Sequence, residues 1–366
     1  MVYIVDAHQD LAYNMLNFER DYLCSAYDIR KDEAGTDIIN NTGDSVLGWP
    51  EFQKGQVAVI FSTLFVAPEQ YKFSEVEKVA YRAADEARVF LQKEVDIYHQ
   101  WEQTHPDAFQ LIRKRQDVEK ILTPWKNQPA QYPEKTHPIG LVLLFEGAEA
   151  IGQIEDLEHW HKMGVRIVGP VWAGTRFCGG TYTSGGFTPE GYELLDFMNQ
   201  LGFILDVSHM NEKSALQALD YYPGKIIASH VNARRLVKDD PRERQFSDET
   251  IQALLNRDGV MGAVMYNRFI KAGWKHTDGK HEVTLDDLIA HIDHVCQMAG
   301  DTQHAGLGSD FDGGFGYDAI PSELDTITDL QKMVPLLQNK GYNEGDIQNI
   351  MGANWIKVLE SGLPES

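Results

Sequence analysis

Histidine and carboxylate residues follow short apolar runs in this sequence, at points where buried strands would end. The first run ends in Asp6-Ala7-His8-Gln9-Asp10. Because side chains alternate along a strand, Asp6, His8 and Asp10 should point the same way. An imidazole beside a carboxylate at a strand end is a suitable pair of metal ligands. Taken alone, the pair is more simply interpreted as surface or capping residues.

Three further runs end in the same residue types. Glu146 directly follows an apolar run, a place where a carboxylate is usually paired, metal-bound or at the mouth of a sheet. Two consecutive runs end in Ser-His, which places His209 and His230 on neighbouring strand ends. A Ser/His/Asp nucleophile at Ser208-His209 is excluded, because adjacent side chains in a strand point to opposite faces.

The last run ends in a glycine-rich segment, Gly306-Leu-Gly-Ser-Asp-Phe-Asp-Gly-Gly314. It is not a dinucleotide-binding fingerprint, because Phe311 stands where the third glycine of that motif belongs. The glycines instead allow a sharp turn that presents Asp310 or Asp312, although both aspartates also suit an ordinary turn.

Together these residue types indicate a two-metal hydrolytic site. A His/Asp pair, a His/His pair and a shared carboxylate would hold two divalent cations. Such cations turn a water molecule into a nucleophile near neutral pH and polarise a carbonyl group. A nearby free aspartate could accept the proton of that water and pass it to a leaving amine.

The order of apolar runs and helical patterns along the chain predicts a fold that brings these strand ends together. Eight apolar runs alternate with helical patterns, which favours a (β/α)8 TIM barrel over a doubly wound open sheet. Barrel enzymes carry their chemistry at the carboxyl ends of the strands, where all the residues above fall. The runs are residues 3–8, 57–66, 140–146, 165–171, 203–209, 225–230, 259–266 and 305–310.

Helix signals and two insertions complete the expected architecture. We predict a helix over residues 74–99 and helix starts at Thr188, Ser247 and Thr284. Insertions follow the first strand (11–56) and precede the third (104–138), and the first should lie over the barrel mouth. Neither insertion has the composition of a separate domain, so we expect a single barrel domain over residues 1–366.

Composition limits the function. The 366 residues carry 33 Lys and Arg against 55 Asp and Glu, a net charge of −22, which disfavours nucleic-acid and anionic membrane partners. Apolar stretches are too short to span a membrane, and the first residues lack signal-peptide features. Three cysteines without a CxxC pair suit a reducing compartment. We therefore expect a cytoplasmic protein.

Other charged residues have simpler interpretations. His291 and His294, like His159 and His161, are expected on solvated helix faces. The segment 238–244 is expected to be an exposed loop. One of its arginines could nevertheless reach the mouth and bind a substrate carboxylate through two hydrogen bonds.

The sequence resembles the renal (membrane) dipeptidase family of binuclear zinc peptidases, peptidase family M19, within the amidohydrolase-like barrels. The matching motifs run in order along nearly the whole chain. They are Asp-Ala-His-Gln-Asp (6–10), Phe-Glu-Gly (145–147), Gly-Val-Arg (164–166), Gly-Phe-Thr-Pro-Glu-Gly (186–191), Leu-Gly-Phe-Ile-Leu-Asp-Val-Ser-His (201–209), Ala-Ser-His-Val-Asn-Ala-Arg (228–234), Gly-Leu-Gly-Ser-Asp-Phe-Asp-Gly (306–313) and Ile-Met-Gly-Ala-Asn-Trp (350–355).

This resemblance implies a zinc-dependent dipeptidase with two zinc ions per chain. His8 and Asp10 would bind one zinc, His209 and His230 the other, and Glu146 would bridge them. A metal-bridging hydroxide would then attack the peptide bond, with Asp310 transferring its proton. The alternative is another binuclear metal hydrolase of this barrel type, acting on a lactone, cyclic amide or phosphoester.

The resemblance also assigns the substrate contacts. Arg244 best matches the arginine that binds the C-terminal carboxylate of a dipeptide, and Arg242 remains an alternative. Trp172 stands where some members carry a substrate-contacting histidine, and Tyr266 is expected to contact substrate as well. Dipeptides with a C-terminal D-residue are within the expected range, and a homodimer is expected from the habit of the family.

Overall fold

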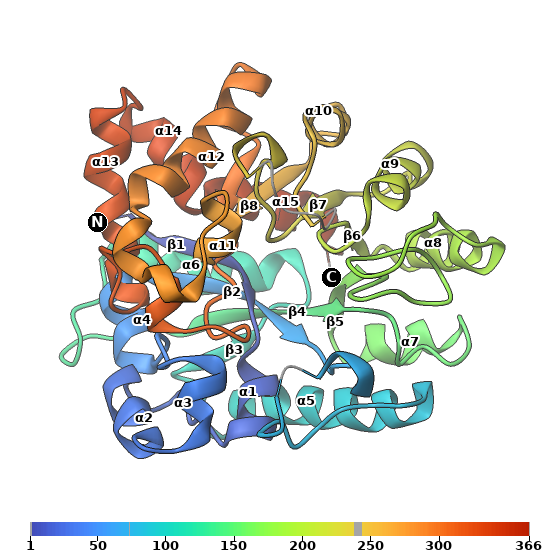
Figure 1. The fold of residues 1–366 in the computed structure, drawn as a ribbon, viewed down its shortest axis with the longest axis horizontal. Coiled ribbons are helices and arrows are strands. Elements are labelled where there is room, and N and C mark those ends of the chain that lie inside the picture. The colour runs from blue at the N-terminus through green and yellow to red at the C-terminus, as the bar shows by residue number, and fades with distance from the viewer. Residues whose placement is uncertain (1, 73, 238–243, 366) are drawn as a thin grey trace.

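The computed structural model describes residues 2–72, 74–237 and 244–365. Within these ranges nine strands form one parallel sheet, in the order β2-β1-β9-β8-β7-β6-β5-β4-β3, and β2 also pairs with β4. That pairing closes eight strands into a barrel with helices around the outside (Figure 1). The predicted (β/α)8 barrel is therefore confirmed. The barrel strands are β1 (Ile4–Gln9), β2 (Val57–Leu64), β4 (Ile139–Glu146), β5 (Val165–Gly169), β6 (Ile204–Asp206), β7 (Ile226–Ala228), β8 (Val260–Ala263) and β9 (Ala305–Leu307).

Every residue of these eight strands is buried. Burial on both faces explains why the strands appear in the sequence as continuous apolar runs instead of alternating patterns. Glu146 pairs with Gly169 at the carboxyl end of β4, and Asp6 pairs with Leu307 where β1 meets β9. These registers bring the strand ends that carry histidines and carboxylates to one rim of the barrel.

One short strand was not predicted. β3 (Phe109–Leu111) pairs with the beginning of β4 and lies within the second insertion, outside the barrel. With three residues it leaves no recognisable pattern in the sequence. The same insertion contains α6 (Arg115–Asn127).

Most predicted helix starts are confirmed by capping bonds. The side chains of Thr188, Ser247 and Thr284 accept the backbone N–H three residues later. The helices of the outer layer are α5 (Ala84–Thr104), α7 (Asp156–Lys162), α8 (Pro189–Leu201), α9 (Glu212–Tyr221), α10 (Asp248–Leu255), α12 (Leu285–Ala299), α13 (Met333–Asn339), α14 (Glu344–Gln348) and α15 (Asn354–Gly362).

The predicted start of the helix at residue 74 is wrong. The helix α5 begins at Ala84, and the preceding segment is a loop. In that loop the backbone of Tyr81 donates to Ala67 O (3.0 Å) and accepts from Glu69 N (2.8 Å). These backbone groups therefore pair with a distant segment instead of with a helical turn.

The insertion after β1 packs against the loop that follows β9, as expected for a segment over the barrel mouth. It consists of α1 (Leu11–Phe18), α2 (Ala26–Glu33), α3 (Asp37–Thr42) and α4 (Trp49–Gly55). Tyr22 Oη (2.9 Å), Ser45 Oγ (2.6 Å) and Val46 N (2.9 Å) all donate hydrogen bonds to the buried Asp312 carboxylate. Asp312 is thus a structural anchor between the two segments.

Among the described residues, no helix combines the length and the apolar character that crossing a bilayer requires. The expected cytoplasmic location and homodimer stay predictions.

Candidate active site

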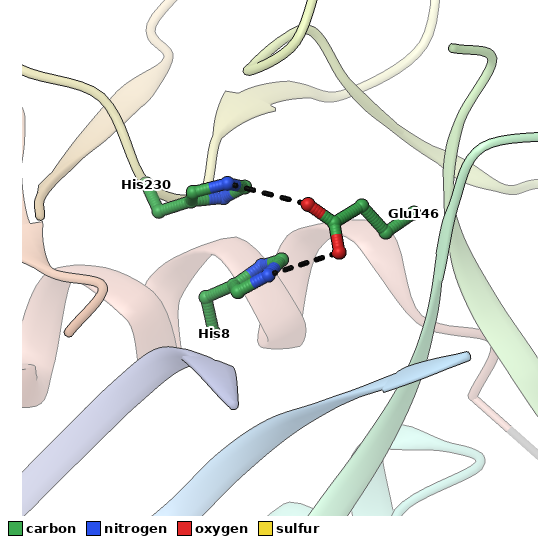
Figure 2. A group of neighbouring side chains, drawn as sticks. All are labelled: His8, Glu146 and His230. Atoms are coloured by element: carbon green, nitrogen blue, oxygen red, sulfur yellow. Dashed lines mark ion pairs between the residues drawn. The ribbon is translucent and has the colours of Figure 1, made fainter. Parts of the chain in front are cut away.

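Glu146 is the hub of the histidine cluster at the barrel rim. Its Oε1 atom lies 2.8 Å from His209 Nε2 and 3.5 Å from His230 Nε2. Its Oε2 atom lies 3.4 Å from His8 Nε2. Figure 2 shows the carboxylate between His8 and His230, with one oxygen toward each ring. The structure therefore brings together residues from β1, β4 and the ends of β6 and β7.

Two aspartates extend the cluster on the side of His8. Asp10 Oδ1 and Asp310 Oδ1 each lie 3.9 Å from His8 Nε2. The Thr63 hydroxyl of β2 donates to Asp10 Oδ1. The ligand atoms of His8, Glu146 and His230 lie within 4.8 Å of one another, as do those of His8, Asp10 and Asp310. The two groups share His8, which fits two neighbouring cations.

Hydroxyl groups orient two of the histidine rings through their Nδ1 atoms. His209 Nδ1 lies 2.8 Å from Thr181 Oγ1, and His230 Nδ1 lies 2.8 Å from Ser229 Oγ. The Ser229 hydroxyl donates to Asp206 Oδ2 (2.6 Å), so its oxygen is left to accept the N–H of His230. This leaves the Nε2 lone pair of His230 directed into the cluster, the arrangement found in metal-binding histidines.

Whether cations fit the cluster can be judged from its hydrogen bonding. His8 Nε2 is buried and has no hydrogen-bond partner, although buried polar atoms nearly always have one. The Nε2 atoms of His209 and His230 lie only 2.9 Å apart. A divalent cation would supply the missing partner of His8 Nε2 and would accept the lone pairs of the other two imidazoles and of the carboxylates around them.

Electrostatics point the same way. Burial lowers the pKa of His8, His209 and His230, so the rings are neutral, which is the form that binds metal. Burial also raises the pKa of Glu146 to about 8. It raises that of Asp10 to about 6, helped by the negative charge of Glu146. Cations would offset the cost of burying these carboxylates.

A cavity of about 270 Å³ opens over this cluster. Glu146, Asp10, His209 and Asp310 contribute to its floor. One wall is aromatic: the Trp172 ring lies 5.1 Å from that of Phe65 and 6.1 Å from that of His209. The expected substrate residue Trp172 therefore stands beside the cluster.

The other two expected substrate residues also line the cavity. Tyr266 lines the cavity and stacks on Phe315 at 4.5 Å between ring centroids. Arg244 also lines it, buried, with Nη1 donating to Ser208 O (3.0 Å) and Nη2 to His230 O (2.7 Å). Arg244 was expected in an exposed loop, which is wrong for this residue. The alternative, Arg242, lies outside the described residues.

The two candidate aspartates after β9 have different environments. Asp310 lines the cavity, and its carboxylate occupies space that a side chain at Gly313 would fill, 2.1 Å from where that Cβ would be. Burial and the charges of Asp10 and Glu146 hold the pKa of Asp310 well above its usual range. Asp312 is fully buried behind it. Only Asp310 is placed to meet a bound molecule.

His291 was expected on a solvated surface, and this is wrong. It is buried, with Nδ1 accepting from Ala233 N (3.2 Å) and Nε2 close to Ile270 O (2.9 Å). His159 is exposed as expected, whereas His294 is half-buried and pairs with Asp248 at 2.8 Å.

Residues 1–362 match the model of a known family, the membrane dipeptidases of peptidase family M19. The chain belongs to this family. The predicted resemblance is thus confirmed, and so is the predicted class of enzyme, a metallo-dipeptidase. Membership also implies dependence on a metal, typically zinc.

Relatives of the chain include proteins with and without an assigned activity. An uncharacterised Klebsiella pneumoniae protein encoded in the pqqA 5′ region is 30% identical over 235 residues, covering 61% of this chain and 82% of that protein. The dipeptidase tcpJ of Claviceps purpurea is 28% identical over 275 residues, covering 73% of this chain but 58% of its own length.

Solved structures share the fold over the full length. Dipeptidase AC, a metallopeptidase of family M19, has a TM-score of 0.78 at 23% identity, covering 100% of this chain and 99% of that one. A Rhodobacter sphaeroides metallopeptidase bound to a phosphinate mimic of the dipeptide L-Ala-D-Ala has a TM-score of 0.78 at 22% identity, covering 99% of both chains.

Several contributors to the site were not predicted, and four of them illustrate why. Thr181 and Ser229 orient histidines, Asp206 anchors Ser229, and Arg268 lines the cavity. Asp206 and Ser229 left a signal, since each sits within the Asp-x-Ser-His or Ser-His endings of its run. Thr181 and Arg268 lie in loops or short turns without any such pattern.

Proposed function

We propose that this chain hydrolyses dipeptides with two zinc ions held at the barrel rim. His8 and Asp10 would bind one ion, His209 and His230 the other, and Glu146 would contact both. The observation that carries this proposal is the convergence of three histidine Nε2 atoms on the two oxygens of Glu146. When bound, the ions would lower the pKa of a water molecule and polarise the substrate carbonyl.

The protein side chains would divide the remaining work. Asp310 faces the cavity beside His8, so its carboxylate is placed to take the proton of the attacking water and pass it to the departing amine. Arg244 donates hydrogen bonds to two backbone carbonyls, which hold its guanidinium at the cavity, where it would bind the C-terminal carboxylate of the dipeptide. Trp172 and Tyr266 would confine the substrate within the cavity.

The proposal extends to dipeptides that end in a D-residue. Its support is the Rhodobacter sphaeroides metallopeptidase of the same fold, which binds a mimic of L-Ala-D-Ala. The stereochemical preference of this chain would depend on the wall formed by Tyr266 and Arg244, beside the expected carboxylate position.

Amino-acid release from a panel of L,L and L,D dipeptides tests the proposal. Zinc-loaded protein should release amino acids, a chelator should abolish the release, and added zinc should restore it. Absence of release from every dipeptide, in protein shown to hold two zinc ions, would refute the proposal. Activity on lactones, cyclic amides or phosphoesters would then be assayed with the same preparation.

A further inference from the structure

The wall of the cavity that contains Tyr266 also contains a second arginine, Arg268. It lies on α11 (Asn267–Ile270), between Tyr266 and Phe269, and all three residues line the cavity. Its side chain is exposed. Nothing in the proposed reaction uses this residue.

Arg268 stands apart from the other arginines that the structure describes. Each of those makes an ion pair or a hydrogen bond, as Arg235 does with Asp248 (3.0 Å) and Arg176 with Glu190 (2.7 Å). Arg268 makes neither within the described residues, although the chain has a net charge of −22 and acidic partners are abundant. An unpaired guanidinium at the edge of a cavity is available to a ligand.

The backbone beneath Arg268 is firmly held. Asn267 is buried and its Nδ2 donates to Ile320 O (3.0 Å), while Phe269 O accepts from Asn232 Nδ2 (3.0 Å). The preceding Tyr266 is stacked on Phe315. The guanidinium thus extends from a fixed base at the rim, so binding an anion there orders only the side chain itself.

Charge in the cavity favours an anion at this position. Among the described residues that line it, the carboxylates are Asp10 and Glu146, which belong to the proposed metal site, and Asp310, which lies 3.9 Å from His8 Nε2. The cations are Arg244 and Arg268. An acidic group on this wall would meet positive charge without an intervening carboxylate.

The position of Arg268 selects one end of the substrate. The Arg244 guanidinium carbon lies 5.5 Å from the centroid of the Phe269 ring, so Arg244 and the α11 segment share one wall. Under the proposed function Arg244 binds the C-terminal carboxylate. A group that reaches Arg268 is then the side chain of the C-terminal residue.

We infer that Arg268 selects dipeptides whose C-terminal residue is acidic, Asp or Glu, by pairing with the side-chain carboxylate. This inference rests on the proposed function and adds a substrate class to it. A guanidinium–carboxylate pair at this exposed rim should favour Ala-Glu over the isosteric Ala-Gln by about two- to fivefold in kcat/KM.

The test compares Ala-Glu with Ala-Gln, and Glu-Ala with Gln-Ala, in zinc-loaded wild type, Arg268→Gln and Arg268→Lys. The control is Arg235→Gln, which removes an exposed arginine on η2 (Arg234–Leu236). Wild type and the control should prefer Ala-Glu about two- to fivefold. Arg268→Gln should bring the ratio near one with Ala-Gln unchanged, and Arg268→Lys should keep part of the preference.

Several results would overturn the inference while leaving dipeptide hydrolysis intact. They are a wild-type ratio near one, a preference for Glu-Ala instead, or an equal loss on Ala-Glu and Ala-Gln in Arg268→Gln. Absence of chelator-sensitive hydrolysis of all four dipeptides would instead refute the proposed function, and the inference with it.

Discussion

Replacing Asp310 by asparagine separates proton transfer from metal binding. Asp310 and Asp312 both have left-handed backbone, with φ of 60° and 62°, a conformation that asparagine adopts as readily as aspartate. The substitution therefore keeps the backbone and the side-chain size and removes one ionisable oxygen. Asp312→Asn is the matched control two residues away.

The expected magnitudes differ because the environments differ. Loss of a general acid–base group at Asp310 should lower kcat by about 10²- to 10⁴-fold. The free energy of unfolding of Asp310→Asn should be unchanged or higher at pH 7, because the charges of Asp10 and Glu146 disfavour a negative charge on residue 310. Asp312, by contrast, accepts three hydrogen bonds and lies 3.3 Å from buried Arg20, so Asp312→Asn should lower the free energy of unfolding by about 2–3 kcal/mol.

Three measurements on each variant decide the matter: kcat for one dipeptide, zinc content after dialysis, and urea unfolding. The expected pattern is loss of kcat with two zinc ions retained in Asp310→Asn, and lower stability with a smaller loss of kcat in Asp312→Asn. Full activity in Asp310→Asn would refute the proton-transfer role. Zinc loss in that variant would show that Asp310 acts as a ligand instead.

Three other substitutions probe the remaining parts of the site and the fold. Glu146→Gln removes the charge that faces three imidazoles, and metal analysis should find bound zinc reduced from two ions to one or fewer per chain. Arg244→Lys cannot hold two carbonyls and a carboxylate in one fork, so KM for dipeptides should rise about ten- to hundredfold in steady-state assays with a smaller change in kcat. Burial lowers the pKa of His291 to about 4, against about 6.5 in an unfolded chain. The unfolded state therefore takes up a proton first as the pH falls, and the free energy of unfolding should drop by about 1.4 kcal/mol per pH unit between pH 6.5 and 4. In urea titrations of zinc-loaded protein, His291→Gln should remove that part of the pH dependence, and an unchanged slope would contradict it.

The candidate metal residues could be predicted because they interrupt strong patterns. Histidines and carboxylates at the ends of apolar runs are conspicuous, and the barrel places all such ends on one rim. His8, Glu146 and His209 are each predicted in this way from the sequence. Their convergence on shared atoms is a property of the closed barrel, which the pattern predicted correctly.

Other features depend on contacts between distant segments, and the local pattern was misleading there. Helical spacing of Val76, Val79, Ala80 and Ala83 suggested a helix, but the backbone of that segment bonds to residues near Pro68. His291 was predicted to be exposed because it shares a helix face with His294. In the structure the backbone N–H of Ala233 donates to its buried ring, a contact between distant segments.

Arginine side chains were the hardest to place from sequence. Arg244 is buried because two backbone carbonyls on separate strand ends accept from it, an arrangement that requires both ends to be fixed first. No sequence pattern indicated that Arg268 lines the cavity, because α11 has only four residues and therefore no recognisable periodicity.

The pairing of β1 with β9 has a consequence for how the chain matures. The proposed site draws on positions from His8 to Asp310, and β9 is itself held by Trp355 Nε1 donating to Leu307 O at 3.0 Å. A chain that ends before β9 therefore lacks part of the site, and zinc uptake would report that the end of β1 has met the ends of β4, β6 and β7. Bound metal would join the beginning of the chain, through His8 and Asp10, to the ends of β4, β6 and β7.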